Sequence, residues 1–514
     1  MNSDQPKIFL AKNIVIFLSS AFLSIPMFSF FYVAISRAAY PFQIEWIEAS
    51  LYLNVMRILQ GKPIYGPPSV EFVPALYTPF YYYASSLFAL VTENIMFSMR
   101  IVSIIATVIM AISIYGICHR LGWNFLENFI AVGVFFASYK VAGFYYDLGR
   151  VDNLALSLSA LSSWLALRQK NRLSYGILIG FILGLAFFTK QHALLSAGFL
   201  LIYLGIRKEW KTAFGLAGAL IVLIAGYYFV SYLTTGFWTF FYTVTVPGSS
   251  PILKRMLLVF LRDILIPTYW PLLLIILASI VILFVRRDWR LYSGQIIAMA
   301  CVMTPLAIFG VGTYIKIWGY INGFGGVAAA IGIITAFCVH QLLKSSSSFL
   351  KTPVLKYSSF GLIFLLIVWQ FWMLRYNPRS QIPREQDAQA GFQLLQEIKQ
   401  LPQPVFIPTA AYMLDLVGLP TNYHVSQYSD ISLGAKYNSS VKSVYEQYGS
   451  EVTDPWQNGY FQAYVSPNTK YFDDYFSDDK GYQCKDFPEV VLKSIDGAGT
   501  FLRGICVKPN RNNP

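Results

Sequence analysis

The stretch QIEWIEASLYLNVMRILQGKPIY, residues 43–65, follows the first long apolar run of the chain. It places two carboxylates, Glu45 and Glu48, where the chain is expected to leave the membrane, and a short helical pattern follows them. Charged side chains at the edge of a membrane are costly unless they are solvated, paired or functional. The rest of the sequence has to explain why a chain this apolar carries two acids there.

The residues after the two acids predict a short amphipathic helix that lies in the membrane interface. Asn54 and Arg57 fall on its polar face, and Gly61 with Pro63 marks its end as a C-cap and a stop. Its other face is apolar and repeats at helical spacing, through Ile47, Leu51, Val55 and Ile58. The two acids stand at the helix start, where the helix dipole favours negative charge, so simple capping stays open beside a functional role.

The composition is that of a membrane protein with many spans. Of 514 residues, 56% are hydrophobic and 13% are charged, far from the average of soluble proteins. Apolar runs of about 20 residues recur between Lys12 and Tyr376, and each can cross a hydrocarbon core of about 30 Å. The first run, residues 14–35, is longer than the apolar core of a cleaved signal peptide, so we expect it to remain as a helix.

The net charge of +13 is concentrated in short turns between apolar runs. These turns contain Arg168, Lys170 and Arg172; Arg207, Lys208 and Lys211; Arg286, Arg287 and Arg290; and Lys344, Lys351 and Lys356. Basic turns of this kind mark cytoplasmic loops of membrane proteins. The placement explains the charge without nucleic acid, and we expect no nucleic-acid partner.

The basic turns predict about eleven spans with a cytoplasmic N-terminus and an extracytoplasmic C-terminal part. The apolar stretch YTPFYYYASSLFALV, residues 77–91, cannot be one of them if the turns alternate correctly, and its tyrosines and proline suit the interfacial aromatic belt. The expected spans lie near residues 14–35, 95–117, 125–144, 151–167, 173–189, 191–206, 212–234, 264–286, 291–312, 320–343 and 357–376.

The composition changes near Asn377. Residues 377–514 hold 15 of the 26 acidic residues and no further apolar run of spanning length. We therefore expect an all-α transmembrane domain over residues 1–376, with interfacial helices within 45–91, and an extracytoplasmic α/β domain over residues 377–514.

Short patterns in the tail support its mixed α/β character. Residues 388–401 have helical periodicity, and residues 405–408 are a strand candidate. Cys484 and Cys506 are the only cysteines of the tail, and they flank two short apolar runs, 490–492 and 500–502, that can pair as a hairpin. In an oxidising compartment we expect a disulfide between these two cysteines.

Two more polar clusters interrupt the apolar runs on the side expected to face outward. The segment YYDLGRVDN, residues 145–153, carries Asp147, Arg150 and Asp152. An ion pair between Arg150 and Asp152 that only holds the helix ends is the alternative to a functional site there.

The other cluster is FFTKQH, residues 187–192, where Lys190 and His192 separate two apolar runs. A lysine at this position either snorkels to the interface or contacts a phosphate, since an ammonium is a compact anion-binding charge.

Taken in order, these pieces resemble the membrane glycosyltransferases of the GT-C fold. They are most similar to the branch that includes protein O-mannosyltransferases, the aminoarabinose transferases of lipid A and Rgt-like bacterial enzymes. The matching pieces are the acids of the first outer loop, L-Q-G-x-x-I-Y at 59–65, Y-x-P-x-Y-Y at 77–82, Asp152 in the second outer loop and T-K-Q at 189–191. The resemblance covers about residues 10–345.

The chain departs from its relatives at the first-loop acids. Relatives often have adjacent Asp-Glu, whereas Trp46 and Ile47 separate the acids here. The spacing to Gly61 favours Glu48 as the equivalent acid.

The resemblance implies an inverting transferase that takes a sugar from a polyprenyl-phosphate carrier at the outer face of a bacterial plasma membrane. The acceptor is not identified. Glu48 is the expected general base, Glu45 a positioning group, and Asp152 orients the acceptor or Arg150. The donor phosphate is expected to meet Lys190, Arg150, Lys254 and Arg255. The substrate cavity is expected to include Trp46, Tyr77, Tyr81, Asp147 and His192.

No CxxC pair or histidine-rich spacing predicts a metal site, and we expect no certain cofactor. A divalent cation stays open, because Glu45, Glu48 and Asp152 are hard oxygen donors that could share one ion if folding brings them together.

Three other classes of function remain open. A transporter or lipid flippase would place acids near the membrane midplane, but the acids here avoid it. A lipid-linked polysaccharide polymerase or ligase depends on arginines in large outer loops, and here Lys254 and Arg255 form the only such pair. A non-catalytic scaffold would bind a partner through the tail.

Overall fold

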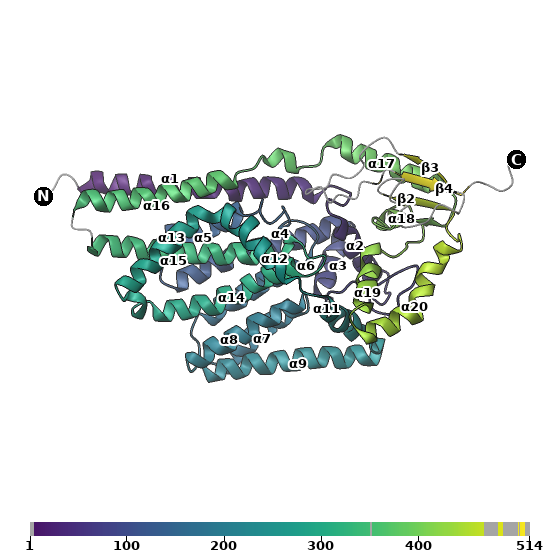
Figure 1. The fold of residues 1–514 in the computed structure, drawn as a ribbon, viewed down its shortest axis with the longest axis horizontal. Coiled ribbons are helices and arrows are strands. Elements are labelled where there is room, and N and C mark those ends of the chain that lie inside the picture. Colours follow the sequence, from purple (N-terminus) through teal and green to yellow (C-terminus); the bar gives the residue numbers. More distant parts are fainter. Residues whose placement is uncertain (1–4, 350–351, 467–481, 487–501, 503, 509–514) are drawn as a thin grey trace.

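The computed structural model describes residues 5–349, 352–466, 482–486, 502 and 504–508. Long helices run side by side along the molecule, and the C-terminal helices and strands gather at one end of them (Figure 1). We call this end of the bundle the domain end.

Helices long and apolar enough to cross a membrane make up most of the bundle. Seven such spans occur among the described residues. They belong to α1 (Gln5–Ala38), α4 (Ile95–Arg120), α9 (Trp210–Thr235), α12 with α13 (Lys254–Val259 and Ile266–Val285), α14 (Ser293–Ile315), α15 (Gly325–Phe349) and α16 (Pro353–Leu374). Four shorter helices complete the bundle, namely α5 (Phe125–Ala137), α6 (Val151–Ala166), α7 (Leu173–Phe187) and α8 (Leu194–Ile206). Each span expected from the sequence coincides with one of these segments, so the chain is an integral membrane protein with many spans.

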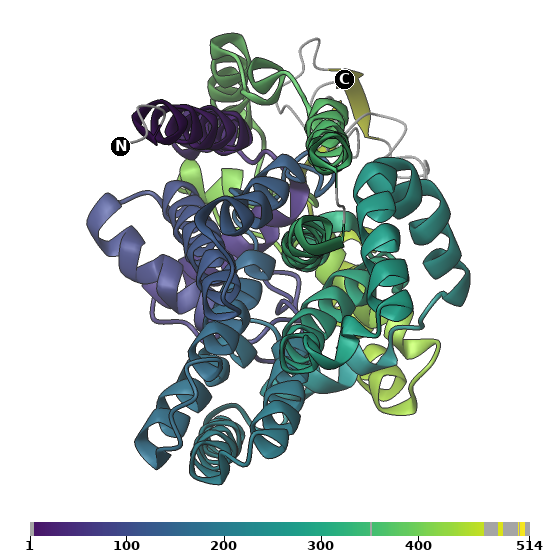
Figure 2. The same cartoon turned by 90° about the vertical axis from the view of Figure 1, so that its left-hand side faces the viewer.

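Small residues let neighbouring helices of the bundle approach closely. Viewed along the bundle, the helices stand in cross-section with short connections (Figure 2). Where α7 meets α9, a Cβ added at Gly176 would lie 2.1 Å from the carbonyl oxygen of Thr212. No side chain fits that gap, so glycine at this position is required by the backbone contact.

The helices α2 (Trp46–Leu59) and α3 (Phe80–Thr92) lie at the domain end. At about 1.5 Å per residue, the 13 residues of α3 are about 20 Å long. That residues 77–91 do not span stays a prediction from the alternation of the basic turns. Gly61 follows α2 with φ +66°, as expected of its C-cap region.

One expectation about α2 is wrong. Asn54 was placed on an exposed polar face, but its side chain is fully buried and donates to the Ser50 carbonyl oxygen at 3.0 Å. The reason is that the C-terminal part covers α2: the Tyr52 hydroxyl donates to Asp415 Oδ2 at 2.9 Å. The helix is therefore enclosed by protein on both sides instead of lying open in the interface.

The C-terminal part combines helices with a small sheet, as expected. Its helices are α17 (Glu385–Gln400), α18 (Tyr412–Leu416), α19 (Val425–Ala435) and α20 (Ser439–Gln457). Its strands are β1 (Val405–Phe406), β2 (Ala463–Ser466), β3 (Gln483–Asp486) and β4 (Gly504–Val507), in the order β1-β2-β4-β3. The pair β1 and β2 is parallel, and the other two pairs are antiparallel.

A disulfide joins the last two strands. Cys484 and Cys506 face each other in the antiparallel register of β3 and β4 and are bonded. The expected pairing is thus present. The apolar run at 490–492 and most of that at 500–502 lie outside the described residues, and the paired strands carry the cysteines themselves.

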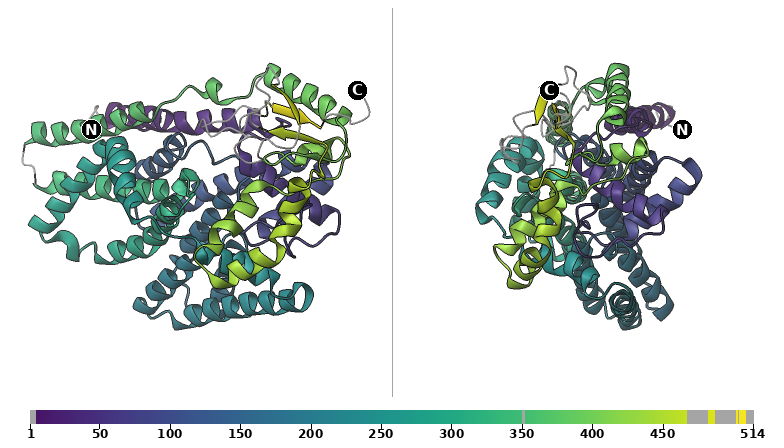
Figure 3. Two further views of the ribbon diagram at one scale, coloured as in Figure 1. Left: turned by 45° about the vertical axis from the view of Figure 1, so that its right-hand side comes forward. Right: turned by 90° about the vertical axis from the view of Figure 1, so that its right-hand side faces the viewer.

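One apolar cluster connects the C-terminal part to the membrane helices. It joins buried residues of α2, such as Leu51, to Leu394 of α17, Phe406 of β1 and Tyr412 of α18. With the domain end facing the viewer, α19 and α20 lie across the ends of the helices (Figure 3). The C-terminal part thereby packs on α2.

Candidate active site

Glu45 and Glu48 begin α2 as a reciprocal pair. Glu45 is the N-cap, and its Oε2 accepts the Ile47 amide hydrogen at 3.0 Å. Glu48 Oε2 accepts the amide hydrogens of Ile44 at 2.7 Å and of Glu45 at 3.4 Å. This is a capping box, so both acids satisfy amides at the open end of the helix.

Beyond the cap, Glu48 is enclosed in a complete set of hydrogen bonds. Arg100 of α4 donates from Nε to Oε1 and from Nη2 to Oε2, each at 2.9 Å. The Gly149 amide adds a bond to Oε1 at 2.8 Å, and neither Glu48 nor Arg100 has any exposed surface. Burial by itself would raise the pKa of Glu48, but Arg100 and the amide hydrogen bonds bring it below its ordinary value.

The guanidinium of Arg100 also ties the first outer loop together. Its Nη1 donates to the carbonyl oxygens of Arg37 and Tyr40, and its Nη2 donates to that of Phe42. The Glu48–Arg100 pair therefore holds the loop between α1 and α2 in place. This surrounding gives Glu48 little room to reach a substrate hydroxyl.

Glu45 belongs to a second network that runs across three helices. Its Oε2 accepts from Arg150 Nη1 at 2.9 Å, and Arg150 Nε contacts Asp152 Oδ2 at 3.5 Å. Asp152 also accepts from Lys190 Nζ at 2.5 Å through Oδ1. Glu45, Arg150, Asp152 and Lys190 thus form a row in which acids and cations alternate, at the domain end of α2, α6 and α7. Each of the four side chains is buried and keeps a small exposed fraction.

The structure also brings Asn322 into this row, which the sequence did not suggest. Its Nδ2 donates to Asp152 Oδ2 at 2.7 Å. Asn322 lies in a short turn, Ile321–Phe324, that precedes α15. A single amide in a glycine-rich turn carries no recognisable sequence signal. The sequence reasoning also missed the buried cations Arg37 and Arg100, although a charge in or beside an apolar run is a signal of a functional or structural role.

Aromatic rings lie beside both cations of the row. Lys190 Nζ lies 5.6 Å from the centre of the Tyr77 ring, and the Arg150 guanidinium lies 5.4 Å from that of Tyr145. These are cation–π distances. Trp46, the residue after Glu45, is tilted against the His424 ring with 5.8 Å between centres.

His192 lies close to the row but does not contact the acids directly. Its ring meets Phe309 edge-on at 5.7 Å, and it feels the charges of Lys190, Lys316 and Asp152. Lys316 donates from Nζ to the Pro247 carbonyl oxygen at 2.7 Å. Two ammonium groups, those of Lys190 and Lys316, thus lie near this ring, together with the Asp152 carboxylate that pairs with Lys190.

Four residues expected in the site lie elsewhere. Tyr81 is fully buried, and its hydroxyl donates to the Met99 carbonyl oxygen at 2.7 Å, which holds α3 against α4. Asp147 is buried against Arg37 and Tyr139. Lys254 and Arg255 are exposed on α12. The sequence alone could not distinguish these four residues from those of the row, because all of them lie in segments that are expected on the outer side of the membrane.

The three acids do not form a set of metal ligands in this arrangement. Within the described parts of the chain, no three His, Cys, Asp or Glu side chains approach closely enough to share an ion. The neighbours of Glu45, Glu48 and Asp152 are guanidinium and ammonium groups, which occupy the positions a cation would need.

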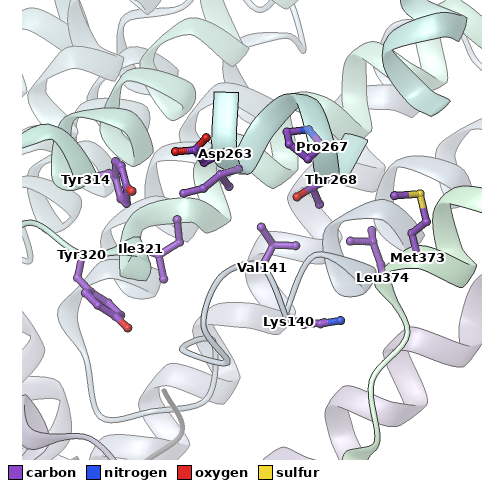
Figure 4. A pocket seen from close by; sticks show the side chains of 11 residues that line it. Lys140, Val141, Asp263, Pro267, Thr268, Tyr314, Tyr320, Ile321, Met373 and Leu374 are labelled. Carbon is purple, nitrogen blue, oxygen red and sulfur yellow. The ribbon is translucent and has the colours of Figure 1, made fainter. Parts of the chain in front are cut away.

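A cavity of about 600 Å³ opens beside the site. Its wall includes Tyr320 and Ile321, which directly precede Asn322, and continues over α13 and α16 through apolar side chains (Figure 4). Lys140, Asp263 and Thr268 add polar groups to the wall. None of the acids of the row lines this cavity.

Comparisons with known proteins identify the fold. No curated protein sequence is significantly similar to the chain. The sequence pattern of the family described as dolichyl-phosphate-mannose-protein mannosyltransferase matches residues 76–233, which contain Tyr77, Arg150, Asp152 and Lys190.

Two solved structures of ArnT from Cupriavidus metallidurans are similar to the chain, each with a TM-score of 0.55 and 12% identity. The one bound to undecaprenyl phosphate is matched over 96% of this chain and 98% of that chain, and the apo structure over 97% and 98%. The expected resemblance is confirmed over nearly the whole length, and the chain is a membrane protein with the GT-C glycosyltransferase fold.

Proposed function

We propose that the protein is an inverting glycosyltransferase that moves a sugar from a polyprenyl-phosphate carrier to an acceptor at the extracytoplasmic face of a bacterial plasma membrane. The N-terminus is then cytoplasmic and the C-terminal domain, residues 377–514, extracytoplasmic. The observation that carries the proposal is the row Glu45–Arg150–Asp152–Lys190 at the domain end of the spans. Acids and cations alternate there at the depth where a lipid phosphate and an acceptor can meet.

The cations of the row suit the leaving group. A polyprenyl phosphate departs as a stable anion, so departure needs positive charge and no protonating acid. Lys190 is supported as the phosphate contact because a second ammonium, that of Lys316, interacts with it electrostatically, and because Arg150 contacts the same carboxylate, Asp152. The exposed pair Lys254 and Arg255 receives less support, since it lies apart on α12.

Glu45 is the better supported general base. The acceptor oxygen forms a bond to the anomeric carbon while the bond from that carbon to the phosphate oxygen breaks. The acceptor proton passes to a carboxylate, and the electron pair of the broken bond leaves with the phosphate. Glu48 has both oxygens bound to Arg100 and amides, whereas Glu45 lies beside Tyr77 and Arg150 at the open side of the row. We therefore assign the base role to Glu45 and a structural role to Glu48.

The proposal is tested in cells that lack the gene and carry either the wild-type or a variant copy. Mass spectrometry of extracted lipids measures the ratio of sugar-charged to free polyprenyl phosphate. Glu45→Gln keeps the size of the side chain but cannot accept the proton, so transfer should fall roughly 10²–10⁴-fold and charged carrier should accumulate.

The matched control is Glu93→Gln, which changes an exposed acid at the end of α3 and should leave the ratio at the wild-type value. If the Glu45→Gln cells and cells without any copy both keep a wild-type ratio, the protein does not consume a carrier-linked sugar. A transporter or flippase would instead change where the charged carrier accumulates, without a change in the envelope glycans that depends on Glu45.

A further inference from the structure

Residues 76–80 of the first outer loop are hydrogen-bonded to the end of α7. The Thr78 hydroxyl donates to the Phe187 carbonyl oxygen at 2.7 Å. The Phe80 amide donates to the Phe188 carbonyl oxygen at the same distance. Both acceptors stand at the C-terminal end of α7, so this part of the loop is held at the end of the helix that leads into the row.

The side chain of Gln191 joins this part of the loop to a third element. Its Nε2 donates to the Leu76 carbonyl oxygen at 3.1 Å and to the Thr243 carbonyl oxygen at 2.6 Å. Thr243 belongs to a π-helical turn, Phe241–Thr245. Because both partners are acceptors, the amide has to present its NH₂ group to them, and both of its hydrogens are used. One side chain thus ties the loop to the π-helical turn.

Tyr77 is the residue whose backbone these contacts hold. The Leu76 carbonyl is part of the peptide bond to Tyr77, and the Tyr77 carbonyl oxygen accepts from the Tyr65 hydroxyl at 2.6 Å. The centre of the Tyr77 ring lies 5.6 Å from Lys190 Nζ. A backbone held on both sides of the Cα atom limits where the ring can lie, so the position of the ring depends on the Gln191 bond.

The Lys190 ammonium contacts two aromatic rings and one acid. Its Nζ lies 5.1 Å from the centre of the Phe309 ring, in addition to the contact with Tyr77, and both are cation–π distances. An ammonium has three N–H donors, and one of them binds Asp152. Within the described parts of the chain this ammonium makes no other hydrogen bond, so two donors remain for a phosphate. The rings help to set the direction in which these donors point.

We propose that Gln191 is a positioning residue for the donor site. By binding the Leu76 carbonyl oxygen it holds Tyr77 against Lys190, and this keeps the ammonium directed at the phosphate of the carrier. The inference rests on the proposed function and deepens it, because it names a residue that sets the affinity for the donor without contacting the donor. Gln191 transfers no proton and forms no bond in the reaction.

A double-mutant cycle on the purified protein tests this role. Gln191→Met keeps the length of the side chain but cannot donate, and it is combined with Lys190→Met. The Kd for undecaprenyl phosphate is measured by titration of the wild type, of the two single variants and of the double variant. The matched control is Gln295→Met, which removes an amide that donates to the Leu121 carbonyl oxygen at 2.7 Å, at the end of α4 away from the row.

We expect Gln191→Met to raise the Kd for undecaprenyl phosphate roughly 3- to 10-fold, the range for losing a hydrogen bond between neutral groups. When Lys190→Met is already present, the same change should alter the Kd less than about 2-fold, because the group through which Gln191 acts has been removed. Gln295→Met should bind with the wild-type Kd. A purely structural loss would instead raise the Kd by the same factor whether or not Lys190 is present.

Thermal unfolding in detergent shows that each variant is folded before the titration. If Gln191→Met does not yield folded protein, Gln191→Asn takes its place in the cycle. It keeps the amide on a side chain that is one methylene shorter and cannot reach both carbonyl oxygens. Its Kd should also rise, and the rise should again disappear when Lys190→Met is present.

Three outcomes would overturn the proposal. A wild-type Kd in Gln191→Met beside a raised Kd in Lys190→Met would remove Gln191 from the donor site and leave the proposed function standing. An equal rise with and without Lys190, or an equal rise in Gln295→Met, would make Gln191 a general structural contact. If Lys190→Met itself binds undecaprenyl phosphate with the wild-type Kd, the failure belongs to the phosphate contact of the proposed function.

Discussion

The two ion-pair networks at the start of α2 use the same chemistry in different surroundings. Glu48 and Arg100 are completely enclosed, and the arginine binds three loop carbonyl oxygens besides the carboxylate. Glu45, Arg150, Asp152 and Lys190 form an open row whose side chains keep 2–9% of their surface exposed. Two acids three residues apart therefore have different surroundings: Glu48 anchors the loop, and for Glu45 we propose a role in the reaction.

The enclosure of Glu48 predicts the largest effect. Glu48→Gln would leave the Arg100 guanidinium buried without its counter-charge, which costs about 3–5 kcal/mol in such pairs. We expect a marked fall in the yield and unfolding temperature of the purified protein, measured by thermal unfolding in detergent. Glu93→Gln, at an exposed position, should change the stability by less than about 0.5 kcal/mol.

A stable, well-folded Glu48→Gln protein with lost turnover would reverse this comparison. It would return the base role to Glu48, as the spacing to Gly61 favoured, and make the Arg100 pair part of the chemistry.

The open row predicts an intermediate effect on ligand affinity. Lys190→Met keeps the apolar stem of the side chain and removes the ammonium, while Asp152 retains Arg150 and Asn322 as partners. Loss of one charged contact should weaken the binding of undecaprenyl phosphate about 10- to 100-fold, measured by titration of the purified protein. Lys254→Met removes an exposed lysine of α12 and is the matched control.

Equal losses from Lys190→Met and Lys254→Met would show that the phosphate senses general surface charge. Unchanged binding in Lys190→Met would mean that the lysine is only a structural partner of Asp152. The row would then have a structural role, as the Glu48–Arg100 pair does.

The smallest expected effect is a pH dependence of the free energy of unfolding, which His424 of the C-terminal part causes. His424, behind Trp46, is buried, and burial lowers its pKa to about 4. An unfolded histidine binds a proton near pH 6.5, so the unfolded state takes up more protons than the folded state as the pH falls below that value. The stability present above pH 6.5 is therefore lost progressively down to about pH 4, and we expect a loss of about 1 kcal/mol between pH 7 and pH 5.5.

Thermal unfolding at the two pH values measures this loss, and His424→Gln should reduce the difference. If the wild type and His424→Gln respond equally to pH, the histidine titrates freely, and the contact between Trp46 and the C-terminal part is looser than the structure indicates.

What the sequence determined on its own was the membrane class and the order of the spans. Those features follow from local properties, because apolar run length and basic turns are visible without any partner. The disulfide partners Cys484 and Cys506 were likewise limited by being the only cysteines of the tail.

Apart from the contact of Arg150 with Asp152, which the sequence offered as an alternative, the tertiary structure decided which charges pair. Arg100 lies 52 residues from Glu48, and Asn322 lies 170 residues from Asp152, so their contacts arise only when distant helices pack together. The same packing covers Asn54 and places Gln427 of α19 against Ser50 of α2. A charged residue in an apolar helix has many conceivable partners along the chain. Burial selects one of them, because in a low-dielectric interior only a paired charge can remain ionised.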